Sequence, residues 1–338
     1  MVFVTTRRKK LINTSRSRRG GSRIGKFDEC PTRYFKDFVG PASARREETS
    51  DGTEKGSIGH TMMAHAMLQR AASKGEPVQV NEEVVTPDQA ADYLSPEDAG
   101  AACAADTKTT KHLPVIAAAF KAWQFSGVGA KSTPTHIEAE SFGVWGTWKG
   151  MSGVWSVDPV EAHLLERRPG ASPPKTIRHV LGGTITIEPM NVPGHPDHGW
   201  PVWITRRRDV VWRTTAKAVQ TIDYKFLHAV SDDEVGHNYA PDKWLHIMRL
   251  LDAQEYGDSY GGLWLLAIQN HAPYRVNFVK LEPSRTAISI AQGMLWDLEH
   301  RRAEWERDDP RGAAWDRAGS MACNSRYRIC PYFNQCHG

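Results

Sequence analysis

The stretch from Pro201 to Phe226 constrains the fold of this chain more than any other, because it reads as two strands joined by a short turn. Apolar side chains recur through PVWITRRRDVVW and again through AVQTIDYKF, and the polar TTAK between them is short enough for a hairpin. Pairing the strands about that turn places Asp209 nearly opposite Asp223 on the adjacent strand. Lys225 follows Asp223 by two residues and therefore shares its face of the strand.

Two carboxylates on adjacent strands repel each other unless a cation lies between them. The residues around Asp223 are mostly apolar, which makes an unpaired charge there costly. Asp209, Asp223 and Lys225 therefore predict a site for a hard divalent metal ion with an ammonium group beside it. A surface hairpin with solvated charges is the alternative interpretation of the same pattern.

Asp209 followed by IDYK resembles the core motif of the PD-(D/E)XK nucleases, in particular the branch that includes RecB and AddB. That branch usually has a glycine about three residues before its first aspartate, where this chain has Arg206. Two other aspartates compete for the role: Asp197, which lies in GHPD three residues after Gly194, and Asp158, which lies in SGVWSVD. The hairpin spacing favours Asp209, with Asp197 second.

The resemblance also gives a role to a histidine on an early predicted helix. KGSIGH matches the G-[ST]-x-x-H helix motif of this branch at Gly56, Ser57 and His60, and the family's histidine is a metal ligand. The family implies that Mg²⁺ or Mn²⁺ is bound by His60, Asp209, Asp223 and the backbone carbonyl of Tyr224. Lys225 would orient the attacking water or stabilise the developing oxyanion, and with the two aspartates it would form the catalytic set.

A cysteine cluster near the C-terminus predicts a second metal site. ACNSRYRICPYFNQCHG carries Cys323, Cys330 and Cys336 in a C-x6-C-x5-C pattern, which is typical of soft-metal ligation, and Cys30 is the natural fourth ligand. One early and three late cysteines resemble the iron–sulfur subgroup of the same nucleases, which includes CRISPR-associated and phage-encoded exonucleases. That resemblance implies a [4Fe-4S] cluster that joins the two ends of the chain, and a four-thiolate Zn²⁺ site is the alternative.

The amino-acid composition says little about what the protein binds. A net charge of +4 over 338 residues makes no overall electrostatic prediction, but basic residues crowd into RRKK at 7–10, RSRR at 16–19 and RRR at 206–208. We expect residues 1–25 to form a basic flexible arm and residues 26–338 a single nuclease domain. The sequence has neither a membrane-length apolar run nor a signal-peptide core, so we expect a cytoplasmic, reducing setting without membrane contact.

Together these features predict an α/β fold with a restriction-endonuclease-like core, in which helices flank a central mixed sheet. The predicted function is a metal-dependent deoxyribonuclease that cleaves phosphodiester bonds in single-stranded DNA or at DNA ends, in recombination, repair or phage DNA processing. Arg206 and Arg208 are the predicted DNA contacts, and unwinding of duplex DNA would need a helicase or recombination partner. The alternatives are a non-catalytic DNA-binding module with a structural zinc site and a small-molecule metallohydrolase.

Overall fold

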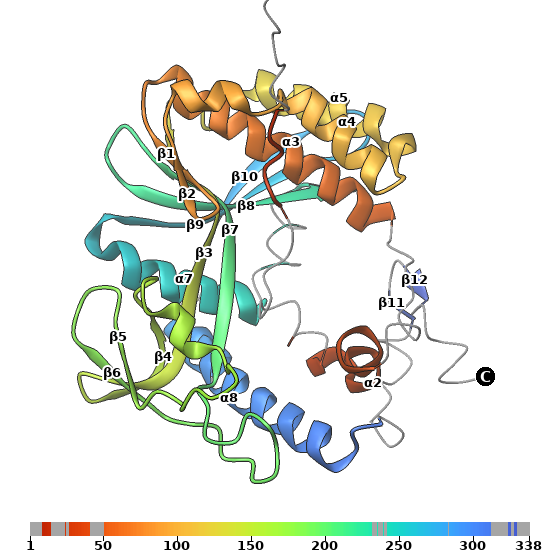
Figure 1. Cartoon of the computed structure of the whole chain (residues 1–338). Coiled ribbons are helices and arrows are strands. Elements are labelled where there is room, and N and C mark those ends of the chain that lie inside the picture. Colours follow the sequence, from red (N-terminus) through yellow and green to blue (C-terminus); the bar gives the residue numbers. More distant parts are fainter. Residues whose placement is uncertain are drawn as a thin grey trace, which may run out of the picture.

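The computed structural model describes residues 9–14, 24, 27–40, 51–231, 235, 239, 242–282, 284–311, 324–325 and 328–329. Over these residues the chain forms a large mixed β-sheet with helices against both faces, which confirms the α/β class (Figure 1). None of the helices in this described part is long and apolar enough to cross a membrane.

The sheet has a continuous path of strands with a side branch. Its strands lie in the order β10 (Val276–Leu281), β9 (Tyr260–Gln269), β8 (Val219–Leu227), β7 (Trp203–Arg213), β3 (Thr133–Trp148), β1 (Val78–Val80) and β2 (Glu83–Val85). Neighbours on this path are antiparallel except the pairs β8–β9 and β1–β3. A parallel pair needs a crossover, and α7 (Lys243–Tyr256) provides it between β8 and β9.

The side branch extends from the far half of β3. It consists of β4 (Met151–Ser156), β5 (Thr176–Arg178) and β6 (Thr184–Ile187). Both β4 and β6 pair with β3, and β5 pairs with β6. A separate cluster of buried apolar side chains fills this branch, so it is an extension of the main sheet with its own small core.

Three helices cover one face of the sheet: α3 (Asp51–Ser73) and α5 (Leu113–Ser126) lie on the strands, and α4 (Pro96–Asp106) packs against α3. The buried side of α3 carries Ile58, Met62 and Met67, which share one apolar cluster with Ile222 and Tyr224 of β8. Short signals set the helix ends. The Ser95 hydroxyl accepts a hydrogen bond from the Asp98 N–H at 3.1 Å before α4, and Gly127 follows α5 with a left-handed φ of 69°.

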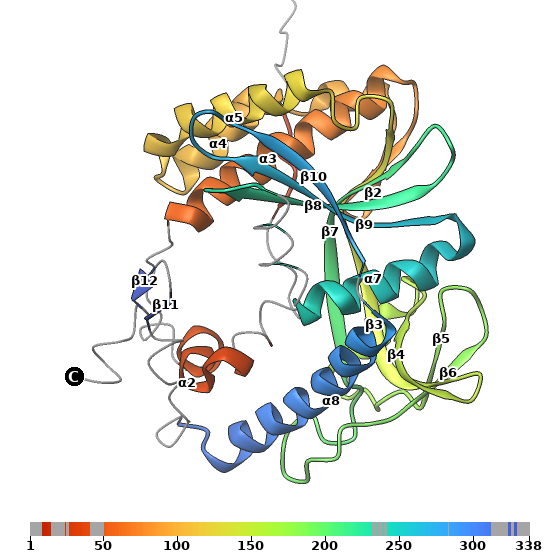
Figure 2. The same cartoon turned by 180° about the vertical axis from the view of Figure 1, so that it is seen from behind.

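The opposite face of the sheet is covered by α7 and by α8 (Arg285–Asp308), as seen from behind in Figure 2. Near the end of α8 lies α2 (Pro31–Tyr34), which continues as a π-turn (Phe35–Val39). The remaining short elements are the 3₁₀ turns Asp88–Asp92, Thr110–His112, Ala162–Leu165 and Gly257–Ser259 and a separate hairpin of β11 (Asn324–Ser325) with β12 (Arg328–Ile329).

The sheet splits at the hairpin that the sequence predicts. β7 and β8 pair from Arg213↔Val219 only as far as Val210↔Ile222, and a turn closed by the Thr214 N–H and the Ala218 carbonyl joins them. Beyond that step β7 pairs with β3 alone and β8 with β9 alone, and the two strands diverge in Figure 1. We call this divergence the fork. Asp209 and Asp223 are the first residues beyond the last pair.

The alternation of side chains breaks at the same level on β7 and β3. Val210 and Trp212 pack in the cluster on the α3 face, whereas Arg208, an even number of residues away, reaches α7 on the other face. On β3, Glu138 has a left-handed φ of 53°, a rare conformation for a residue with a side chain. The ladder bridges Ile137↔Val210 and Ala139↔Arg208 but skips the step between them, so Glu138 and Asp209 lie opposite each other at an unpaired step without a shift of register.

The N-terminal segment, residues 9–14, is docked on the protein, which corrects the expectation of a flexible arm for these residues. Lys10 bridges to the chain at Tyr93, and the N–H of Ile12 donates to Nε2 of His65 at 3.0 Å. The hydroxyls of Thr14 and Thr61 lie 3.1 Å apart, which ties the segment to α3. Except for Ile24, the remainder of residues 1–25 lies outside the described residues.

Candidate metal centre

Three potential metal ligands converge where the sheet splits. His60 from α3, Glu138 from β3 and Asp209 from β7 each offer a ligand atom, and these atoms all lie within 4.8 Å of one another. Nδ1 of His60 lies 3.5 Å from Oδ1 of Asp209. The structure therefore brings together two ligands that the sequence predicts, His60 and Asp209, and adds one that it does not, Glu138.

His60 reaches the fork because α3 lies unusually close to β8. A Cβ atom on Gly59 would lie 2.2 Å from the ring of Phe226, so only glycine allows this approach. By contrast, a Cβ on Gly56 would meet no atom within 4 Å. The glycine that packing requires in KGSIGH is thus Gly59, one residue before the histidine, although the motif match rests on Gly56.

Asp209 fills the gap between the diverging strands. Its Oδ2 accepts a hydrogen bond from the N–H of Tyr224 at 2.6 Å, which replaces the ladder bond that β7 no longer provides. Burial acts to raise the pKa of Asp209, but the charges of His60 and Lys225 outweigh it, so its pKa lies below the usual value. Burial likewise acts to lower the pKa of His60, and Asp209 reverses this and raises it. Each of the two groups thus favours the charged form of the other.

Asp223 and Lys225 form an ion pair of their own beside these ligands, which confirms that they share a face of β8. Burial and the negative charge of Asp209 raise the pKa of Asp223, against the opposing effect of Lys225. Burial acts to lower the pKa of Lys225, but the two aspartates raise it above its ordinary value, so Lys225 is fully charged at neutral pH. Asp223 stands outside the group of three close ligand atoms, and its ligation of a metal stays a prediction, as does that of the Tyr224 carbonyl.

Glu138 is a candidate metal ligand that the sequence analysis did not identify. Its residue exposure is only 2%, and among the described residues its Oε1 has no hydrogen-bond partner. Burial and the negative charges of Asp209 and Asp223 raise its pKa well above the ordinary value, with Arg207 opposing them. The sequence offers a signal only in the form of a glutamate within the apolar strand THIEAES, and it cannot show the left-handed φ that turns this side chain into the fork.

The donor set fits a divalent cation. One imidazole and two carboxylates supply nitrogen and oxygen ligands, and the unpartnered oxygen of Glu138 is a buried acceptor that a cation would satisfy. Oxygen ligands suit Mg²⁺ and Mn²⁺, and the imidazole shifts the preference toward Mn²⁺. A bound cation would also relieve the repulsion among Glu138, Asp209 and Asp223 that raises the pKa values of the first and last.

The two rival aspartates lie elsewhere and have other partners. Asp158 lies 3.5 Å from Nε of Arg178. Asp197 lies 3.6 Å from Nη2 of Arg302 and 3.9 Å from Nε of Arg167. Neither belongs to a group of three or more metal-ligating side chains within the described part of the chain, so the geometry favours Asp209 over both.

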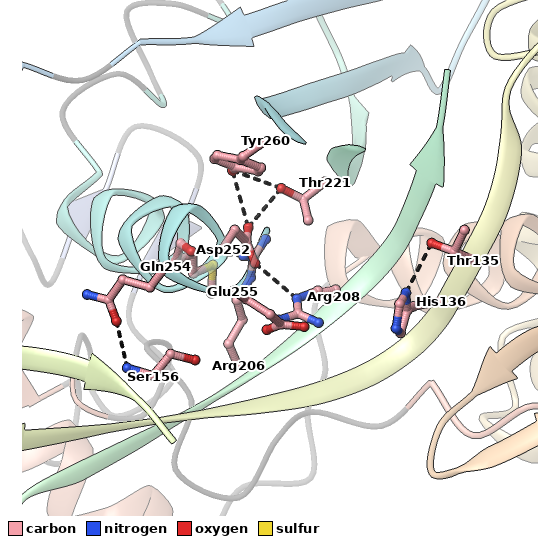
Figure 3. A network of polar contacts seen from close by, with 11 residues as sticks. Thr135, His136, Ser156, Arg206, Arg208, Thr221, Asp252, Gln254, Glu255 and Tyr260 are labelled. Atoms are coloured by element: carbon pink, nitrogen blue, oxygen red, sulfur yellow. Dashed lines mark hydrogen bonds and ion pairs between the residues drawn. The ribbon is translucent and has the colours of Figure 1, made fainter. Parts of the chain in front are cut away.

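Arg206 and Arg208 are buried and paired within the protein, which disagrees with the exposure that the predicted role as DNA contacts requires. Their exposures are 3% and 2%, and both guanidinium groups pair with the buried carboxylate of Asp252 on α7 (Figure 3). Arg208 also pairs with Glu255. Burial and the neighbouring Arg208 lower the pKa of Arg206 only to about 10, so both remain charged and buried at neutral pH. The guanidinium N–H groups that could bind phosphates are already used in polar contacts with α7.

The same network joins three adjacent strands behind the fork. Asp252 accepts hydrogen bonds from Thr221 on β8 at 2.8 Å and from the Tyr260 hydroxyl on β9 at 3.3 Å, in addition to its pairing with β7 (Figure 3). Each of these partners offsets part of the free-energy cost of burying the charged carboxylate of Asp252. Asp252 thereby fixes β7 and β8 relative to each other next to Asp209.

The four predicted thiolate ligands are only partly described. Cys30 is buried and directly precedes α2, while Cys323, Cys330 and Cys336 lie outside the described residues. The fifth cysteine, Cys103, is partly buried on α4, and burial raises the pKa of its thiol. The four-cysteine cluster therefore stays a prediction of the sequence.

No known protein family matches this chain, and a search of curated proteins finds no significant relative.

Proposed function

We propose that this protein is a metal-dependent deoxyribonuclease that hydrolyses phosphodiester bonds in DNA. The observation that carries the proposal is the convergence of His60, Glu138 and Asp209 on one point beside the ion pair of Asp223 and Lys225. A divalent-metal site with an adjacent fixed ammonium group suits the stabilisation of a negatively charged phosphoryl transition state.

The order of these groups along the chain supports the assignment to the PD-(D/E)XK nucleases. A helix histidine comes first, then a strand aspartate, then Asp-x-Lys on the next strand of the same hairpin, as in the RecB-like branch. We therefore assign the sheet from β3 to β9, together with α3 and α7, to a restriction-endonuclease-like core.

Each side chain has a role in this proposal that follows from its surroundings. His60, Glu138 and Asp209 would hold the metal ion, which when bound lowers the pKa of water and offsets negative charge on the transferring phosphate. Lys225 cannot serve as a general base at neutral pH because its pKa is raised, so it acts as a charged hydrogen-bond donor to the attacking water or the developing oxyanion. Asp223 fixes the position of that ammonium group through their ion pair.

The direct test is degradation of labelled single-stranded DNA with Mn²⁺, and its loss on addition of a chelator. Asp209→Asn and Lys225→Met should each abolish cleavage while the fold, checked by circular dichroism, persists. Asp158→Asn is the matched control because it removes the charge of a rival aspartate outside the centre. The proposal fails if Asp209→Asn retains parental activity or if Asp158→Asn loses it.

We extend the proposal to a cluster ligated by Cys30, Cys323, Cys330 and Cys336, with [4Fe-4S] favoured over Zn²⁺. Support comes from the sequence pattern together with the burial of Cys30 at the start of α2. Anaerobically purified protein should be brown and contain iron and sulfide. A colourless protein with one equivalent of zinc would instead establish the four-thiolate zinc site.

A further inference from the structure

We propose that a pocket next to the metal centre receives the terminal nucleoside of a DNA strand, and that it prefers an end with a free hydroxyl group to a phosphorylated end. This inference rests on the proposed nuclease function and adds the kind of DNA end on which the enzyme acts.

The pocket has a volume of about 560 Å³ and lies between three parts of the chain. The N-terminal segment contributes Lys10 and Asn13, the β1–β2 hairpin contributes Asn81 and Glu83, and the strands β3 and β7 contribute Glu138, Glu140 and Arg207. Ligand pockets for small molecules measure about 300–1,000 Å³, so this volume suits one nucleoside and no long stretch of DNA.

Glu138 connects the pocket to the metal centre. It lines the pocket, it belongs to the group of three metal ligands, and among the described residues its Oε1 has no partner. A phosphate held at the metal would therefore lie at the mouth of the pocket. The nucleoside attached to that phosphate would extend into the pocket.

The N-terminal segment and the β1–β2 hairpin, which line the pocket, hold each other in place. When the side-chain amide of Asn81 is oriented with its nitrogen toward Asn13 and Glu138, that nitrogen lies 3.0 Å from the carbonyl oxygen of Asn13 and 3.2 Å from that of Glu138. Lys10 is fixed on both sides, because its N–H donates to the Asp92 carbonyl at 2.7 Å and its carbonyl accepts from Leu94 at 3.1 Å. These contacts hold the N-terminal segment and the β1–β2 hairpin together as one side of the pocket, whose size admits one nucleoside beyond a phosphate at the metal.

The charges of the lining favour a hydroxyl end. Nζ of Lys10 lies 3.7 Å from Glu83, and Nη2 of Arg207 lies 3.1 Å from Glu140, so each cation of the lining already has a carboxylate partner. Glu82 adds a further carboxylate to the lining. A terminal phosphate carries about −1.5 to −2 charges at pH 7 and would be repelled, because phosphate sites rely on available Arg or Lys donors. Asn13 and Asn81 add uncharged side chains to the lining, which do not repel a sugar or base.

The test uses one internally labelled single-stranded oligonucleotide in several forms: with a hydroxyl or a phosphate at each end, and as a covalently closed circle. With Mn²⁺ we expect the hydroxyl-ended linear form to be shortened from one end and the circle to stay intact. Phosphorylation of that end should slow cleavage roughly tenfold, the order expected for a like-charge contact near a protein surface, and added salt should reduce the difference.

The outcomes separate this inference from the function on which it rests. Cleavage of the circle as fast as the linear form, or equal rates for hydroxyl and phosphate ends, overturns the inference and leaves the nuclease function standing. Absence of cleavage on every form defeats both.

A charge-reversal variant tests the electrostatic step. Glu82→Lys places a cation at the exposed tip of the β1–β2 hairpin and should raise the rate on phosphate ends relative to hydroxyl ends several-fold. Glu76→Lys makes the same change at an exposed position outside the pocket lining and should leave that ratio unchanged. An unchanged ratio in Glu82→Lys would overturn the charge argument.

Discussion

Glu138 on β3 lies directly across from Asp209 on β7, at the step that the ladder between these strands skips. The pairs Ile137↔Val210 and Ala139↔Arg208 flank that step, and Glu138 adopts a left-handed φ of 53° there. Strained backbone of this kind persists only where the surrounding structure enforces it, and such positions cluster at functional sites. The interruption turns two opposed strand residues into carboxylates that lie close together beside His60.

Glu138→Gln should stabilise the metal-free protein and weaken its response to metal. The pKa of the Glu138 carboxyl group is raised in the folded protein, so the unfolded chain releases the carboxyl proton at a lower pH. The negative charge of Glu138 therefore destabilises the folded state at neutral pH. Removing the charge removes that penalty together with a metal ligand. Thermal unfolding with and without Mn²⁺ should show a higher Tm without metal and a smaller Mn²⁺-induced rise.

Glu140→Gln is the matched control for that experiment, because Glu140 lies two residues further along β3 and pairs with Arg207. It should leave the Mn²⁺-induced rise near that of the parent. An undiminished rise in Glu138→Gln would show that Glu138 does not bind the metal.

Gly59→Ala should destabilise the protein, whereas Gly56→Ala on the same helix should not. A methyl group at Gly59 would lie 2.2 Å from the ring of Phe226, which is buried and cannot move aside without displacing α3. Overpacking of this kind costs about 1–3 kcal/mol. A methyl group at Gly56 meets no neighbour, and replacing a helical glycine by alanine gains roughly 0.5–1 kcal/mol.

Urea unfolding of the two glycine variants measures this difference, and Gly59→Ala should also show a weaker Mn²⁺-induced stabilisation because His60 moves with α3. Equal stabilities of the two variants would mean that α3 and β8 are not in the close contact described.

Asp252→Asn should destabilise the fold strongly, because it leaves Arg206 and Arg208 buried without their shared carboxylate. Loss of one partner from a buried ion pair costs about 3–5 kcal/mol. Asp258→Asn, at an exposed position shortly after α7, should have little effect. Urea midpoints measure both, and a midpoint for Asp252→Asn near that of the parent would contradict the structural role assigned to the two arginines.

The contact between α2 and α8 should weaken in acid. Glu306 on α8 accepts hydrogen bonds from the Tyr34 hydroxyl at 3.1 Å and from Arg302 at 2.8 Å, and it lies 3.2 Å from Nε2 of His195. Burial acts to raise the pKa of Glu306, but these partners outweigh it and lower the pKa to about 2. A carboxyl group whose pKa is lowered by folding stabilises the folded state at pH values above its unfolded pKa of roughly 4.3. That stabilisation is lost as the pH falls toward 2.

Stability measured from pH 5 to pH 2 should therefore fall less steeply in Glu306→Gln than in the parent, by about 3 kcal/mol over the range. Glu304→Gln, which removes a carboxylate from the exposed side of the same helix, should keep the parental slope. A parental slope in Glu306→Gln would remove Glu306 as the source of the pH dependence.

Cys30→Ser should abolish the visible absorbance of an iron–sulfur cluster, because it removes one of four proposed ligands. Cys103→Ser is the control, since Cys103 lies on α4 and outside the proposed set. A cluster between Cys30 and Cys323 would close a loop through most of the chain, worth roughly 5 kcal/mol in the chain-entropy description, so Cys30→Ser should also lower the Tm. Retention of the full spectrum in Cys30→Ser would exclude Cys30 as a ligand.

The sequence by itself determined the hairpin from Pro201 to Phe226, because strand alternation and a short polar turn are local properties. It also determined that Asp223 and Lys225 share a face, since that follows from the period of a strand. The proposal that His60 binds a metal ion came from a local helix motif, and the structure places that side chain 3.5 Å from Asp209.

The tertiary structure alone decided which charges meet at the fork and which are structural. The role of Glu138 depends on a left-handed φ and on a skipped step shared by two strands, and neither leaves a local signal in the sequence. The burial of Arg206 and Arg208 depends on Asp252, which lies more than forty residues away and meets them only after α7 packs on the sheet. Strand alternation predicts which residues share a face, but the packing of distant elements decides whether that face meets solvent, a metal ion or a buried carboxylate.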